Sequence, residues 1–296
     1  MNLGRAKLIL VVAFTGLNIF LGYQLFWPDF GRLTEVSVTA EDLRETEQML
    51  AENNLVLDAS FDRSPQTSDF ITVSPDWKIR QALLYDLIKT GVQIEETEHT
   101  TYYRSVDRVA VIHNSGLIQI FYSSGSGASL GDNGTELGHG DLKNRVEEFL
   151  AEDELLPEGI NFDYLEQKED GSIALNYHQT LGGMPIFSGQ IKIVIDGDRV
   201  KAVEIYWLEL AERAPPRDME VISPAEALKN LVSELGPVSE ERIIEKIDLG
   251  YYSGEYDAEK WEVPPVWRIV LDNNQYYYIN AFTGNLEKDT VIPEQL

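Results

Sequence analysis

The sequence predicts an α+β protein with a single N-terminal transmembrane helix, followed by an extracellular domain of antiparallel β-meanders that each pack with a helix. Three observations predict this class. Residues 8–27 form an uncharged, apolar run of twenty residues. Several later stretches repeat their apolar residues with the period of a helix, and the segments between them alternate polar and apolar residues as strands do.

The apolar run has the length of a membrane-spanning helix. Twenty residues that each rise 1.5 Å match a hydrocarbon core of about 30 Å. Arg5 and Lys7 precede the run and the first charge after it is Asp29. Because positive charges stay on the inner side, we expect residues 1–7 in the cytoplasm and the rest of the chain outside. Pro28 then ends the helix.

A cleaved secretory signal peptide is the competing interpretation of the same run. Cleavage requires small residues at the end of the apolar stretch, whereas this one ends in Tyr23-Gln24-Leu25-Phe26-Trp27. The bulky residues favour a retained anchor, and Tyr23 and Trp27 fit an aromatic belt at the outer membrane surface.

One face of the predicted helix is a candidate for partner contact. Thr15, Asn18 and Gly22 have the i, i+3, i+7 spacing that places a hydroxyl, an amide and a bare backbone on one side. Such residues allow close helix–helix contact in lipid, and an intramembrane amide usually finds a partner. Small and mildly polar residues are also common in membrane helices without any such role.

The charge of the chain excludes several partners. It has 50 acidic and 24 basic residues, a net charge of −26. A field of this sign repels phosphate backbones and anionic headgroups, so no nucleic-acid partner is expected. The absence of cysteine excludes disulfides, thiolate nucleophiles and thiolate zinc sites.

Residues 28–37 are predicted to be a juxtamembrane linker, and residues 38–122 a first α+β unit. A helix is expected over 38–54 after the N-cap Thr39, a strand before Pro75, an amphipathic helix over 77–91, and two or three strands up to Tyr122. Residues 123–140 are rich in Gly and Ser, which is typical of a linker or loop.

The second α+β region, residues 141–296, is predicted to contain two helix-plus-sheet units, 141–210 and 221–290. The first has a helix over 141–152 and strands over 161–167, 173–179, 186–195 and 200–208. The second begins at the N-cap Ser223 with Pro224 at the first helical position, and Gly236-Pro237 ends its helix. Strands are expected over 243–251, 265–271 and 275–280.

No catalytic, cofactor-binding or metal-binding constellation is predicted. His99, His113, His139 and His178 lack the spacing of a zinc hydrolase. Ser124-Gly125-Ser126-Gly127 lacks the frame of a nucleophile elbow. Asp196-Gly197-Asp198 and Asp272-Asn273-Asn274 do not continue into a calcium loop, so hairpin turns are the better interpretation. An extracellular hydrolase is therefore disfavoured, and no enzyme activity or cofactor is expected.

The segment from Arg5 to Phe26, and LNIFLGYQL within it, resembles the anchor of the YycI family, and the length and domain plan agree. The resemblance implies a regulatory membrane protein of a cell-wall-linked two-component system in Gram-positive bacteria. It further implies contact with the membrane helices of the sensor histidine kinase WalK (YycG) and a hetero-oligomer with a YycH-like protein. Regulation of this kind requires no catalytic residue.

A second resemblance concerns residues 177–207. Gln179, Gly183, Pro185 and Phe187 match a pattern of PepSY-like and thermolysin-propeptide modules. In those modules a helix packs on an antiparallel sheet, and the surface binds a protein or restrains a protease. This resemblance implies a PepSY-like repeat, and it leaves open an alternative function: a surface-anchored module that binds or inhibits an extracellular protease.

Overall fold

The computed structural model describes residues 14, 37–64, 66–78, 81, 83–85, 91–130, 139–152, 155, 157–212, 219–254 and 258–287. The chain divides into two compact units, Met1–Ser37 and Val38–Leu296. In the first unit, Phe14 is helical and exposed. The predicted span 8–27 otherwise lies outside the described residues. Within the described part of the chain, no helix has both the length and the apolar composition that a membrane crossing requires.

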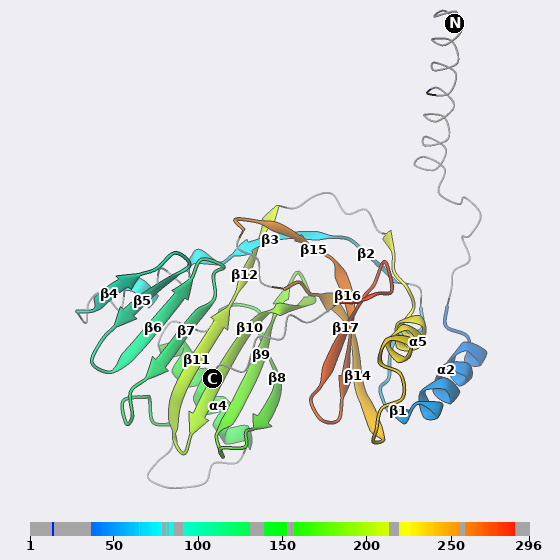
Figure 1. Ribbon diagram of the computed structural model, residues 1–296, viewed down its shortest axis with the longest axis horizontal. Coiled ribbons are helices and arrows are strands. Elements are labelled where there is room, and N and C mark those ends of the chain that lie inside the picture. Colours follow the sequence, from blue (N-terminus) through cyan, green and yellow to red (C-terminus); the bar gives the residue numbers. More distant parts are fainter. Residues whose placement is uncertain are drawn as a thin grey trace, which may run out of the picture. The chain divides into compact units, whose positions relative to one another are not determined.

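The second unit has an α+β fold based on one large sheet (Figure 1). The strand order is β18-β17-β16-β14-β10-β11-β7-β6-β5-β4, with β9 and β8 branching from β10, and β1 pairing with β14. The strands of the sheet are β1 (Leu55–Leu57), β4 (Gln93–Glu96), β5 (Thr100–Arg104), β6 (Arg108–His113), β7 (Ile118–Tyr122), β8 (Ile160–Gln167), β9 (Ile173–Leu181), β10 (Met184–Asp196), β11 (Arg199–Tyr206), β14 (Arg242–Tyr251), β16 (Pro265–Leu271), β17 (Tyr276–Asn280) and β18 (Leu286–Glu287).

Two small sheets complete the unit. Strands β12 (Leu208–Glu212), β3 (Ile71–Pro75) and β15 (Trp261–Val263) form one, and β13 (Met219–Glu220) pairs with β2 (Thr67–Ser68) in the other. The three-stranded sheet links both halves of the large one, because β12 directly follows β11 and β15 directly precedes β16 (Figure 1).

Helices α2 (Ala40–Glu52) and α5 (Pro224–Leu235) begin where the sequence predicts. Thr39 Oγ1 accepts a hydrogen bond from the Asp42 amide at 3.1 Å, and the Asp42 carboxylate accepts one from the Thr39 amide at 3.0 Å. This capping box satisfies amides that have no partner inside the helix. In α5, Ser223 caps the helix and Gly236 ends it with φ 65°, a value that favours glycine.

The helices cover different parts of the large sheet. Helix α4 (His139–Glu152) packs on the strands around β10, and its Val146 and Leu150 are fully buried there. Helices α2 and α5 pack on β14, β16 and β17 through Leu50, Leu228 and Leu231. Each of α4 and α5 is followed by an antiparallel meander, β8–β11 and β14–β16–β17–β18 respectively. A helix followed by a meander thus occurs twice, while the PepSY-like repeat stays a prediction from the sequence.

The stretch up to Tyr122 differs from the prediction, because it contains four strands, β4 to β7, rather than two or three. The turn at Asp107 and the tight turn at Gly116 divide what the alternation alone presents as longer segments. Strand β7 pairs with β11 from Ile118 to Phe121, so these strands extend the sheet of the following region.

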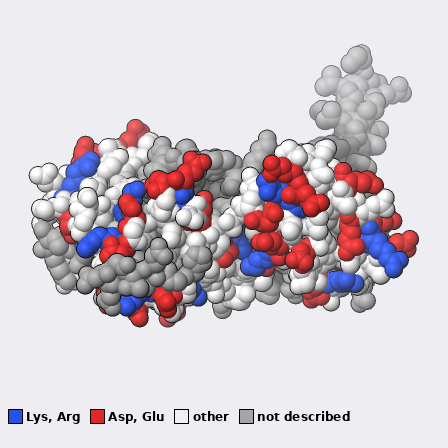
Figure 2. Space-filling view, turned by 90° about the horizontal axis from the view of Figure 1, so that it is seen from below, with Lys and Arg blue, Asp and Glu red and all other residues white. Residues whose placement is uncertain are grey.

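Figure 2 shows acidic side chains spread over one face, as the net charge requires.

Candidate functional site

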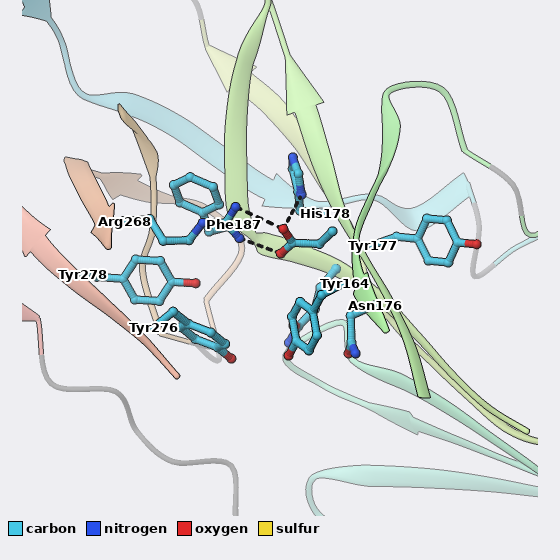
Figure 3. Close-up of a pocket in the computed structure, with 10 residues that line it drawn as sticks. Tyr164, Asn176, Tyr177, His178, Phe187, Arg268, Tyr276 and Tyr278 are labelled. Carbon is cyan, nitrogen blue, oxygen red and sulfur yellow. Dashed lines mark hydrogen bonds and ion pairs between the residues drawn. The ribbon is translucent and has the colours of Figure 1, made fainter. Parts of the chain in front are cut away.

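A groove lies between strands β8, β9 and β10 on one side and strands β14, β16 and β17 on the other (Figure 3). It contains two cavities, of about 20 Å³ and about 270 Å³. Asp163 and Tyr164 of β8, Arg268 of β16 and Tyr276 of β17 line both of them. The shared residues make the two cavities parts of a single groove.

Three irregularities of strand pairing border this groove. Strand β8 has an extra residue at Asp163, β10 has residues 187–189 in excess over β9, and β14 has an extra residue at Glu245. A β-bulge interrupts the alternation of a strand and directs a side chain to a new position. Asp163, Phe187 and Glu245, one from each bulge, all line the groove.

A buried arginine connects the two walls. Arg268 is 3% exposed, and its guanidinium donates to both carboxylate oxygens of Asp163, with Nη1–Oδ2 at 2.5 Å and Nη2–Oδ1 at 3.0 Å. Nη2 also donates to Asp248 Oδ2 at 3.3 Å. His178 Nδ1 lies 3.7 Å from Asp163 Oδ1. A two-point arginine–carboxylate pair is a strong, directional contact, and here it joins β8 to β16.

The electrostatics of the pair follow from its surroundings. Burial alone would raise the pKa of Asp163, but the hydrogen bonds and charges of His178 and Arg268 outweigh it and hold this pKa well below its ordinary value. Burial alone would lower the pKa of Arg268, but Asp163 outweighs it and the pKa is raised. Both groups are therefore ionised in the folded protein.

Three stacked aromatic rings extend from the guanidinium. Arg268 lies 4.2 Å from the ring centre of Phe187, which stacks on Tyr278 at 5.7 Å, and Tyr278 stacks on Tyr252 at 3.8 Å. Gly250 makes this packing possible, because a Cβ there would lie 2.6 Å from a ring carbon of Phe187. The cation–π contact stabilises a charge that has left water.

Gln179, the first residue of the predicted ectodomain motif, bridges two strands. Its side chain is 1% exposed, donates to the Leu208 carbonyl at 2.5 Å and accepts from the Leu208 amide at 3.2 Å. The Gln179 side chain thus bonds the backbone of Leu208 as the backbone of a neighbouring strand would. Gly189, one of the excess residues of β10, leaves room for the Gln179 side chain, because a Cβ at this position would lie 2.2 Å from Gln179 Oε1.

The other motif residues lie close by. Gly183, with φ 90°, forms the two-residue turn between β9 and β10 together with Gly182, and Pro185 pairs with Thr180 just after it. Only Phe187 also lines the groove. Because Gln179 and Phe187 are buried, the motif holds strands together, and protease binding stays a prediction from the sequence.

Thr15, Asn18 and Gly22 lie outside the described residues, so their role also stays a prediction. Among the residues that the structure describes, no three histidine or acidic side chains gather as metal ligands do. Asp196-Gly197-Asp198 and Asp272-Asn273-Asn274 are strand-connecting turns, as predicted, with φ 63° at Gly197 and 61° at Asn274.

Sequence reasoning missed Asp163, His178 and Arg268 as members of one site. Asp163 and Arg268 are 105 residues apart, so no local pattern links them. One signal was present: Arg268 is the single charged residue in the strand Pro265–Leu271. A charge in a strand that is almost entirely buried must be paired, which predicts a partner without identifying it.

The fold and groove define an α+β domain in which one long, mostly antiparallel sheet carries helices on its faces and a polar, aromatic groove between two of its meanders. The chain belongs to the YycI family, since the model of the YycI protein family matches residues 35–282. This is a family of regulatory proteins of two-component systems.

Solved structures are similar to this chain. An uncharacterized protein from Eubacterium rectale is 12% identical, with a TM-score of 0.51 over 83% of this chain and 98% of that one. YycH from Bacillus subtilis is 15% identical, with a TM-score of 0.49 over 73% of this chain and 52% of that one. At such identities the likeness to the first concerns the fold alone. No curated protein matches the sequence.

Proposed function

We propose that this protein is a membrane-anchored, non-enzymatic regulator of the sensor histidine kinase WalK. It acts through contacts of its transmembrane helix and through an extracellular domain that pairs with a YycH-like partner. The observation that carries the proposal is the match of residues 35–282 to the YycI family. The apolar run 8–27, preceded by Arg5 and Lys7, supports an anchor with its N-terminus in the cytoplasm and its domain outside.

The physical requirement for such control is a difference between two states of the kinase. A helix in lipid shifts a signalling equilibrium only if it packs better against one state, with a coupling free energy of about 1–3 kcal/mol. Thr15, Asn18 and Gly22 are the proposed contact face. Asn18 has the largest role, because its amide loses a hydrogen-bond partner in lipid whenever the contact is broken.

The test is co-purification of the kinase and of a YycH-like protein from membranes that contain the full-length chain. Asn18→Leu should reduce kinase capture and leave capture of the YycH-like protein unchanged. Phe20→Leu, about 200° around the helix from Asn18, is the matched control and should capture as wild type.

A chain shortened to residues 31–296 is the third arm of this experiment. It should retain the YycH-like partner and lose the kinase. Undiminished kinase capture by the shortened chain would contradict control through the membrane helix. Separately, capture of a protease by the shortened chain would support the alternative function, a protease-binding module.

A further inference from the structure

We propose that the groove between strands β8, β9 and β10 and strands β14, β16 and β17 is a binding site for a neutral, hydroxylated ring ligand, that is, a sugar unit. Arg268 and Asn176 would donate hydrogen bonds to its oxygens, and Tyr164 and Tyr276 would contact its ring. This inference goes beyond the proposed function and does not depend on it, because binding is measured without the kinase.

The first step is the presence of buried donors without partners. Arg268 Nε and Asn176 Nδ2 are both buried, and neither has a hydrogen-bond partner among the described residues. Both residues line the smaller cavity. A buried donor left unpaired is destabilising, so two of them at one cavity indicate that an acceptor from outside the chain completes the site.

The second step concerns the charge of that acceptor. The charge of Arg268 is already balanced by Asp163 and Asp248, and Lys246 lies 3.0 Å from Asp248. Glu245 adds a further negative charge to the larger cavity, and the whole chain has a net charge of −26. An anion is therefore repelled. Arg268 Nε and Asn176 Nδ2 cannot bind a cation, because both are donors. The oxygens of an uncharged ligand meet both conditions.

The third step concerns the side chains that would contact the ring of the ligand. Tyr164 and Tyr276 come from opposite walls and line both cavities. The face of a tyrosine ring is negative, and it therefore attracts the weakly positive C–H groups on the flat side of a sugar.

Size agrees with this chemistry. The cavity of about 20 Å³ next to the donors holds one hydroxyl-sized group. The adjoining cavity of about 270 Å³ is slightly below the range for sites of drug-sized molecules, about 300–1,000 Å³, as suits a single ring. A sugar ring in the larger cavity, with one hydroxyl directed at Arg268 and Asn176 in the smaller one, would occupy both cavities.

An extended peptide fits less well. A peptide that adds to a sheet needs a regular edge, and the strands at this groove are interrupted at Asp163 in β8 and at Glu245 in β14. Bulges at edges prevent pairing of this kind. The same bulges supply the side chains that line the groove.

The experiment is isothermal titration calorimetry of the full-length chain in an amine-oxide detergent, which has no sugar headgroup. The neutral probes are N-acetylglucosamine, glucose, chitotriose and cellotriose, so that a free sugar and a glycan chain are distinguished. Trigalacturonate tests an anion and trilysine a basic peptide. Only neutral probes should bind.

Variants assign the binding to the groove. Tyr276→Ala and Asn176→Ala should each weaken binding about three- to tenfold. Tyr276→Phe keeps the ring and should stay closer to wild type, which separates binding from a folding defect. Tyr102→Ala on β5, outside the groove, is the control and should bind as wild type. Failure of every neutral probe to bind, binding of trilysine or trigalacturonate instead, or unchanged affinity in both alanine variants would overturn the inference.

Discussion

At the scale of single residues, Arg268 joins the strands that line the groove. It is buried at 3% exposure, and it holds Asp163 and Asp248 from two different strands. Its own strand is otherwise apolar. A buried charge with this arrangement costs desolvation, and the cost is offset only while both partners are in place.

Arg268→Met should therefore be strongly destabilising. Removing the guanidinium leaves Asp163 ionised in a mostly buried position, and breaking such a pair costs about 3–5 kcal/mol. Urea unfolding of the full-length chain measures this loss of unfolding free energy. Asp163→Asn in the same chain should recover part of the loss, because it removes the uncompensated charge. A double mutant as unstable as the sum of the single changes would show that the two residues are not coupled.

The depressed pKa of Asp163 also predicts a pH dependence. The pKa of an aspartate in an unfolded chain is about 3.9, and the pKa of Asp163 in the folded protein is lower. The contribution of Asp163 to stability is thus fully present above the unfolded pKa and is lost as the pH falls through the folded pKa.

We expect the difference in unfolding free energy between the parent and Asp163→Asn to be constant above about pH 5 and to shrink below about pH 4. Both chains should carry His178→Gln, which removes the nearby imidazole, while Arg268 and Asp248 stay as they are. The measurement is urea unfolding over a pH series. A difference that persists undiminished to the lowest pH at which the protein folds would contradict the ion pair.

At the scale of secondary-structure elements, local signals predict the helices well. Thr39 with Asp42, and Ser223 with Pro224 and Gly236, begin or end α2 and α5 through contacts within a few residues. The groove depends instead on bulges and on partners far apart in sequence. Alternation places strands but cannot locate one extra residue such as Asp163, so the sequence predicted strand β8 and missed what its bulge does.

Strand β10 gives the clearest test at this scale. Its excess residues leave space for the Gln179 side chain, which bonds both backbone groups of Leu208. A Cβ at position 189 would lie 2.2 Å from Gln179 Oε1 and 2.8 Å from its Cβ. Gly189→Ala should therefore cost about 1–3 kcal/mol in unfolding free energy, because the glutamine must move and leave Leu208 unpaired.

The matched control is Gly140→Ala in α4, where an added Cβ meets nothing within 4 Å. Alanine also favours a helix over glycine by roughly 1 kcal/mol, so this variant should be neutral or slightly stabilised. Thermal unfolding of both variants checks the comparison. Equal melting temperatures would mean that β10 relaxes around the new methyl group.

At the scale of the whole molecule, the charge distribution and the proposed anchor act together. Beyond Phe26 the chain has 22 basic and 50 acidic residues, a net charge of −28, while the only charges before that point are Arg5 and Lys7. We propose on this basis that residues 1–7 stay in the cytoplasm and that the acidic domain faces outward. Such a domain stays soluble next to anionic headgroups because it is repelled by them.

The absence of cysteine makes this orientation directly testable. Ser64→Cys introduces one thiol at an exposed position of the domain, and Asn2→Cys introduces one in the predicted cytoplasmic segment. A membrane-impermeant maleimide applied to intact cells should label the first variant and not the second. After permeabilisation both should react. The parent chain, which has no thiol, gives the background.

The same variants separate a retained anchor from a cleaved signal peptide. The bulky end of the apolar run, from Tyr23 to Trp27, disfavours cleavage, so the labelled Ser64→Cys protein should remain in the membrane fraction at full-length mass. Reversing the charges with Arg5→Glu and Lys7→Glu removes the positive-inside bias and should reduce labelling of the Ser64→Cys protein in intact cells. Recovery of the labelled domain from the medium, shortened by the first thirty residues or so, would remove the helix through which we propose that the kinase is regulated.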